Sequence, residues 1–404
     1  MADEVFLFAS TDTNAPVLTG EVGKLVDLLT ACLVDGYATV SVTSITRSGT
    51  TATVTTGSSH GLVTGQMATI ADAVESDYNG RYIVTVTSST VFTYTVANSP
   101  TTPATGTITS RRASAGWTLP YSGTQKAVYR SANGASQQHY FRVLDSGGTA
   151  GGAKEAVIRG YVAMSDVDTG TEPFPTVAQK ADGVYVAKSS TANSTARAWT
   201  IFADDKTLYG YISNGSHMIA FGFGHMNSWV SGDGYNSFLA GSAGGNSATG
   251  VGNANGLSCG MSLNLGAAVP DAAALWVPRA ASQTGTSLAS FSYGLGNNSN
   301  TAGATHGGTT TFSFAGPSSN ADGGLYVAPL LVMEFVSAGA SIVRGSLPGV
   351  YATAHPSGSV SNATTSTGVV GLPSRTVYHQ LVDGRNTGGS ALPGQHTIDI
   401  TGPW

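Results

Sequence analysis

The fold is decided by Val40-Ser-Val-Thr-Ser-Ile45 and Ala52-Thr-Val-Thr55, two short runs in which apolar and hydroxyl side chains alternate. A period of two is the pattern of a β-strand that buries one of its faces. Ser48 and Gly49 lie between the two runs and predict a tight turn. The stretch is therefore expected to form a β-hairpin.

The same alternation continues downstream of this hairpin, and five or six short strands fit between residues 41 and 111. Each of these strands would present one face to a small core. The residues that we expect in this core include Val42, Val54, Met67, Ile83, Phe92 and Tyr94. Residues 41–111 are therefore predicted to be a compact β-barrel or β-sandwich module.

One helix is predicted, over Glu21–Val34. Its apolar positions recur at helical spacing and fall on one face. Thr19 is a candidate cap for the start of this helix, and Gly36 is a candidate for its end.

A second β-rich region with different spacing begins at Trp117, and we place the boundary near residue 112. Antiparallel pairing is the economical arrangement for its strands. The strands expected in this region are 127–130, 138–144, 156–161, 183–187, 199–202, 207–212, 219–223, 325–336, 376–382 and 396–401.

The expected fold class is all-β: mainly antiparallel β-sandwich or barrel domains with long Gly/Ser-rich loops and one short N-terminal helix. The segments are 1–40 with the amphipathic helix, the small module at 41–111, and the main β-body at 112–404. This body is loop-rich at 241–322, and loops of that length are uncommon in isolated compact domains. Either neighbouring subunits order these loops, or the loops are disordered at the surface.

Charged residues make up only 10% of the 404 residues, while the chain has 53 glycines and a net charge of −5. A surface of neutral polar groups repels its neighbours weakly, which suits a subunit packed against others. The 41% of hydrophobic residues favours folding over disorder. Lys and Arg number 18 against 23 Asp and Glu, so no direct nucleic-acid binding is expected.

The segment that starts at Met1 has no basic region followed by an apolar core, so synthesis in the cytoplasm without a signal peptide is expected. The most apolar stretch, 325–336, contains Glu334 and is far shorter than the roughly 20 residues that span a bilayer. No membrane insertion is therefore expected. Cys32 and Cys259 are far apart in sequence and are interpreted as free, buried thiols.

Catalytic motifs are weak, and the chain is expected not to be an enzyme. Gly256–Gly260 matches the G-x-S-x-G pattern, but strand-like alternation follows it where a nucleophile elbow needs a helix. The glycines of 250–256 have the wrong spacing for a dinucleotide-binding loop. No catalytic residue and no cofactor-binding residue is predicted.

No metal site is predicted either. Residues 166–172 contain three carboxylates in a turn-like segment, which is the kind of oxygen cluster that Ca²⁺ accepts. The further ligands of a calcium loop are missing, so turn formation and capping are the favoured roles, with calcium as the alternative. His217 and His225 have no acidic or cysteine partner at zinc spacing.

Several aromatic residues alternate with small ones, and core packing is the favoured role for them. A sugar-binding surface is the alternative. The residues concerned are Trp199, Tyr209, Tyr211, Trp229 and Tyr235.

The module resembles a small β-module of tailed-phage structural proteins. The resemblance rests on His60-Gly-Leu, Gly65, Ile70, Tyr78-Asn-Gly-Arg-Tyr-Ile-Val, Phe92-Thr-Tyr and Ala104-Thr-Gly106. Further segments are similar to a family of uncharacterised phage virion proteins, in which the module looks like an insertion. These segments are Ala15–Gly20, Gly116–Gly123, Arg159–Tyr161, Met164–Gly170 and Ile400–Trp404.

This resemblance implies a non-enzymatic structural component of a tailed-phage virion, at the capsid surface, the neck, or the tail or baseplate. Its partners would be copies of itself and other virion proteins, its location the virion, and capsid decoration one such role. A receptor- or glycan-binding tail protein that recognises a host-surface glycan is the alternative. A polysaccharide-degrading tail enzyme is a third hypothesis, which the missing solenoid repeat disfavours.

Overall fold

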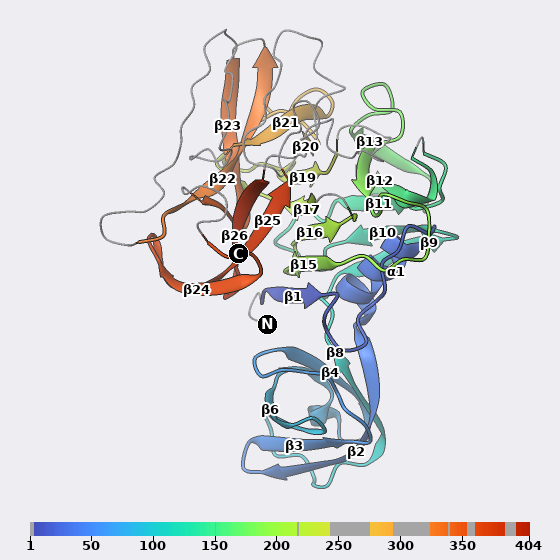
Figure 1. Ribbon diagram of the computed structural model, residues 1–404, viewed down its shortest axis with the longest axis vertical. Helices are drawn as coiled ribbons and strands as arrows, with labels where there is room; N and C mark the ends of the chain where they lie inside the picture. The colour runs from blue at the N-terminus through green and yellow to red at the C-terminus, as the bar shows by residue number, and fades with distance from the viewer. Residues whose placement is uncertain are drawn as a thin grey trace. The chain divides into compact units, whose positions relative to one another are not determined.

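The computed structural model describes residues 4–149, 151–215, 218–242, 275–293, 324–337, 340–353, 360–383 and 393–404 (Figure 1). Of the residues that the structure describes, about 53% are in strands and 6% are helical, and the sheets are antiparallel. The predicted all-β class is therefore confirmed, and the described ranges contain one short α-helix, as expected.

The chain forms two compact units. The module unit consists of Phe8–Val17 and Asp27–Gly116. The body unit consists of Met1–Leu7, Leu18–Val26 and Trp117–Trp404. The division at residues 40 and 111 stays a prediction, and the structural units place residues 27–40 with the module.

The strands of the module unit form one curled sheet in the order β5-β4-β8-β2-β3-β7-β6. β2 is shared by both halves, because its first part pairs with β8 and its second part pairs with β3. The predicted hairpin is β2 and β3, and Gly49 has the positive φ of a turn glycine. The bounds are β2 Tyr37–Ser48, β3 Thr51–Thr56, β4 Met67–Ala73, β5 Gly80–Ile83, β6 Thr85–Ser88, β7 Val91–Thr95 and β8 Gly106–Arg112, with a 3-10 turn at Ser76–Tyr78.

The core of the module unit contains Val54, Phe92 and Tyr94 as predicted, with Val42 packed at its edge. The prediction was wrong for Met67 and Ile83. These two residues pair with each other across β4 and β5, and Ile83 is 54% exposed. Successive strand residues face opposite sides, so the residues adjacent to Met67 and Ile83 face the core in their place. The inward residues here are Ala68 and Ile70 on β4 and Val84, which directly follows β5.

The predicted helix forms as α1, Lys24–Thr30, and continues as a π-helical turn at Ala31–Asp35. Gly36 ends it as predicted, with φ 77° and its N–H donating to the Ala31 carbonyl. The Thr19 hydroxyl does not cap α1 but accepts from the Glu21 N–H one turn earlier, at 3.2 Å. The cap is the Asp145 carboxylate, which accepts from the Leu25 N–H at 2.8 Å.

In the described part of the body unit, the larger sheet has the order β1-β15-β16-β17-β19-β20-β21-β22-β23-β26-β25-β24, with β18 beside β23. Its bounds are β1 Phe6–Ala9, β15 Trp199–Ala203, β16 Thr207–Ser213, β17 Met218–His225, β18 Asn227–Ser228, β19 Ser237–Ala240, β20 Leu275–Val277, β21 Leu288–Tyr293, β22 Val327–Ser337, β23 Ala340–Thr353, β24 Thr364–Val369, β25 Leu372–Asp383 and β26 Pro393–Asp399.

The smaller sheet of the body unit has β12 at its centre, with the order β13-β12-β11-β10-β9 and β14 also paired to β12. Its bounds are β9 Thr118–Gly123, β10 Lys126–Arg130, β11 Tyr140–Leu144, β12 Glu155–Met164, β13 Gly170–Phe174 and β14 Val184–Ala187, with a 3-10 turn at Gly152–Lys154. Trp117 is buried, and its indole donates to the Asp204 carbonyl at 2.8 Å.

Every strand predicted in this unit has a counterpart within a few residues of its expected ends. The strands that the sequence did not predict include β9, β13, β19, β23 and β24. Two strands, β20 and β21, lie inside the loop-rich stretch 241–322. That stretch therefore contributes to the larger sheet.

Candidate functional site

Residues 166–169 form a turn, which is the role that the sequence favoured, and residues 170–172 begin β13. The Asp166 carboxylate accepts from the N–H groups of Asp168 and Thr169 at 2.7 and 2.8 Å, and these bonds lower its pKa. Asp168 pairs with Lys126 and with Arg142. Within the described ranges, no group of three His, Cys, Asp or Glu residues could hold a metal ion.

Several other candidates lie outside the described residues. These are the G-x-S-x-G segment 256–260, the glycines of 250–256, His217 and Cys259. Cys32 is a free, buried thiol, as predicted, and burial raises its pKa well above the usual value. Burial also disfavours the charged form of His225, and for this base it lowers the pKa to about 4.

Core packing is confirmed for three of the five aromatic residues singled out, since Trp199, Tyr209 and Tyr211 are buried. The prediction was wrong for Trp229, whose side chain is 64% exposed. Tyr235 is partly exposed, and the guanidinium of Arg279 stacks 4.4 Å from the centre of its ring.

Trp229 lies beside the outer edge of β23, and this edge is the candidate site. β26 pairs with β23 only at Val350–Ala352, and β18 pairs with it at Gly345 and Ser346. In the part of the chain that the structure describes, no strand pairs with this edge between Ala340 and Val343. Ile342 and Val343 are 45% and 38% exposed. Consecutive strand residues face opposite sides, so β23 exposes apolar side chains on both faces here.

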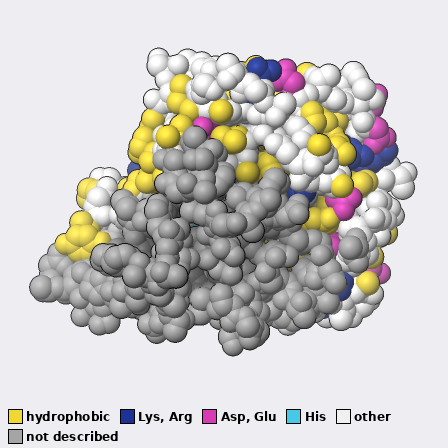
Figure 2. Space-filling model, turned by 90° about the horizontal axis from the view of Figure 1, so that it is seen from above, with side chains coloured by type: hydrophobic (Ala, Val, Ile, Leu, Met, Phe, Trp, Pro, Cys, Tyr) yellow, Lys and Arg dark blue, Asp and Glu magenta, His cyan; other side chains and the backbone are white. Residues whose placement is uncertain are grey.

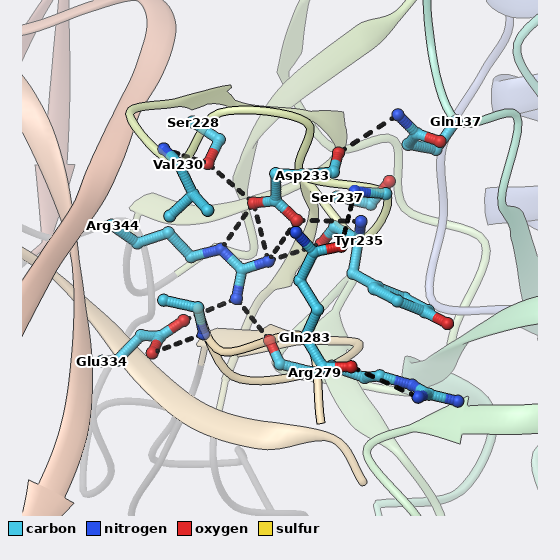
Figure 3. A network of polar contacts seen from close by, with 12 residues as sticks. Gln137, Ser228, Val230, Asp233, Tyr235, Ser237, Arg279, Gln283, Glu334 and Arg344 are labelled. Atoms are coloured by element: carbon cyan, nitrogen blue, oxygen red, sulfur yellow. Dashed lines mark hydrogen bonds and ion pairs between the residues drawn. The ribbon is translucent and has the colours of Figure 1, made fainter. Parts of the chain in front are cut away.

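Behind this edge lies a buried ionic network centred on Arg344 (Figure 3). Its guanidinium donates to both carboxylate oxygens of Asp233, at 3.0 and 2.9 Å. It also donates to Glu334 at 2.5 Å and to the carbonyls of Arg279 and Tyr235. The three charged side chains are at most 1% exposed. A charge set taken so fully out of water is stable only when its hydrogen bonds are nearly complete.

The network holds the turn that carries Trp229. Ser228 donates to the Asp233 carboxylate at 2.6 Å, and the Val230 N–H donates to the Ser228 hydroxyl at 3.2 Å. The Trp229 N–H donates to the Arg344 carbonyl at 2.8 Å, which extends the β18–β23 ladder by one bond. The indole is therefore exposed from a backbone that is fixed on both sides.

Charged groups at the rim neutralise one another. Arg279 pairs with Glu172 at 2.5 Å, and this pairing raises the pKa of Arg279. Gln283 accepts from the Gly234 N–H at 3.3 Å and donates to the Gly232 carbonyl at 3.4 Å. In Figure 2, the described part of the surface shows scattered charged side chains among more numerous apolar and neutral ones.

The candidate site thus combines a strand edge with which no described strand pairs, called the β23 edge (Ala340–Val343), with the apolar side chains of Ile342, Val343 and Trp229. An unpaired edge offers N–H and C=O groups to a strand from another chain. Such an arrangement supports strand addition and apolar contact. The charged residues described around it form mutual ion pairs, which favours a structural role for them.

No helix among the described residues is long and apolar enough to cross a membrane. No family model and no curated protein matches the chain. Among solved structures the chain is similar to Phage phi92 endosialidase, with 12% identity over 90% of this chain and 52% of that chain. The chain spans about half the length of that protein, and the TM-score is 0.17. A similarity this low carries no argument about fold or function.

Proposed function

We propose that the chain is a non-enzymatic structural component of a tailed-phage virion that acts through subunit contacts. The observation that carries the contact role is the β23 edge, where Ile342 and Val343 are exposed on a stretch with which no strand in the described part of the chain pairs. The virion setting is supported by the sequence resemblance alone. Copies of this chain and other virion proteins are the proposed partners.

A contact at this edge would combine two stabilising terms. Strand addition supplies backbone hydrogen bonds, and burial of apolar side chains contributes roughly 25 cal/mol per Å² removed from water. The chain carries few charges, so approaching copies repel each other weakly. Since the Arg344 network fixes β23 and the Trp229 turn, little ordering is needed on contact.

The test is self-association of the purified full chain, measured by sedimentation over a range of concentrations. Ile342→Lys places a charge on the edge, which natural edge strands use to block pairing. We expect association of the unmodified chain and a shift of Ile342→Lys toward the monomer. Val63→Lys is the matched control, because Val63 is 58% exposed in the module unit.

The proposal fails if the unmodified chain stays monomeric at every concentration, or if Ile342→Lys associates like the control. Circular dichroism of both variants separates a loss of contact from a loss of fold. A single β-rich spectrum in all three proteins is expected.

A second candidate function, recognition of a host-surface glycan, is favoured by the exposed indole of Trp229. An aromatic ring on a rigid turn can stack on a sugar. The polar side chain of Gln283 lies against the residues that follow Trp229, where it hydrogen-bonds to Gly232 and Gly234. Binding to a glycan array that Trp229→Ala abolishes and Ile342→Lys leaves intact would support it. A blank array with the unmodified chain would contradict it.

A further inference from the structure

Lys188 and Asp145 form an ion pair in which both side chains are 0% exposed. Lys188 directly follows β14 and Asp145 directly follows β11, and both strands pair with β12. The Lys188 Nζ contacts the Asp145 Oδ1. The pair thus joins the ends of two strands across the central strand of the smaller sheet.

Both groups are held in place by backbone contacts. The Lys188 Nζ also donates to the Glu21 carbonyl at 2.5 Å, and the Asp145 Oδ2 accepts from the Leu25 N–H at 2.8 Å. The Lys188 N–H donates to the Lys154 carbonyl at 2.9 Å. The N–H of Asp145 donates to the Gln125 carbonyl, in the turn between β9 and β10, at 2.8 Å. The amine and the carboxylate are therefore held in contact in a place where both side chains are 0% exposed.

Removal from water disfavours the charged forms of both partners. Transfer of one proton from Nζ to the carboxylate gives a neutral amine in contact with a neutral carboxylic acid. Those are the two reactants of amide formation, and well-oriented groups held in contact can reach effective molarities of about 10⁵ M or more.

We infer that Lys188 and Asp145 are a covalent modification site at which an intramolecular amide bond links Nζ to Cγ. The Nζ lone pair attacks Cγ, and the C–N bond forms as the bond from Cγ to Oδ1 breaks. Oδ1 leaves as water, taking its own proton and one proton from Nζ. The Leu25 N–H stays on Oδ2, where it stabilises the negative charge that develops during attack.

The product is a neutral amide in place of two buried ions. It would close a covalent loop between residues 145 and 188 and would keep β11 and β14 beside β12. This inference does not depend on the proposed virion function, because it rests only on groups inside the body unit.

The test is the intact mass of the full chain without substitutions, measured after denaturation. The expected mass is lower than the sequence mass by one water, about 18 Da. Trypsin is expected to release residues 143–154 joined to residues 181–197, uncleaved at Lys188. Lys188→Arg cannot condense, and its mass is expected to equal its sequence mass. Asp145→Asn is expected to form the same bond with loss of ammonia, about 17 Da.

The inference would be overturned if the chain without substitutions has its full sequence mass and is cut by trypsin at Lys188. So would a water loss that peptide mapping assigns to other residues. Because the decisive result comes from the chain without substitutions, it stands even if a variant does not fold.

Discussion

Replacing Arg344 with Met removes the positive charge at the centre of the buried network while keeping an apolar side chain of similar length. Asp233 and Glu334, each 1% exposed, then stay buried without their cation. Loss of one partner of a buried pair costs about 3–5 kcal/mol. Since two carboxylates lose their partner here, we expect Arg344→Met to lower the free energy of unfolding by about 5 kcal/mol at pH 7.

The assay is urea denaturation followed by tryptophan fluorescence. All five tryptophans lie in the body unit, so the signal reports that unit alone. The variant that adds Asp233→Asn and Glu334→Gln is expected to recover most of the loss. A cost below about 1 kcal/mol, as for an exposed pair, would refute the reasoning.

Further predictions concern a buried histidine and a turn glycine. Burial lowers the pKa of His139 from 6.5 to about 4, so protons bind the unfolded chain first as the pH falls. His139 is therefore expected to reduce stability by about 2 kcal/mol between pH 7 and pH 5, and denaturation of His139→Asn should lack that part of the pH dependence. Gly349 has φ 69°, and a Cβ there would meet the Trp404 indole. Gly349→Ala is expected to cost more than the about 1–2 kcal/mol of Gly368→Ala, which has a similar φ and open space, when their thermal unfolding is compared.

Period-two alternation predicted most of the strands, because an amphipathic strand carries its pattern locally. It was wrong at Met67 and Ile83, where the larger side chains lie outside and smaller neighbours fill the core. Alternation fixes the two faces of a strand but does not say which face is inward when both carry apolar groups. The cap of α1 was missed because Asp145 comes from 120 residues away in sequence.

The candidate site was predictable only in fragments. Glu334 is an acid inside the most apolar stretch, and a buried acid needs a partner. Its partner, Arg344, lies ten residues further along, on β23, a strand that the sequence did not predict. Trp229 was assigned to the core because alternation alone does not reveal that its turn lies at a sheet edge. Exposure at that edge depends on where β18 and β26 stop pairing.

The central claim, that this chain is a multi-copy structural part of a virion, is tested most directly on the particle. The measurement is quantitative mass spectrometry of gradient-purified virions from a phage whose genome carries the coding sequence of this chain. We expect the chain to co-purify in a fixed copy number per particle, comparable with that of other structural proteins. Its absence from purified particles, or trace amounts that vary between preparations, would contradict the account.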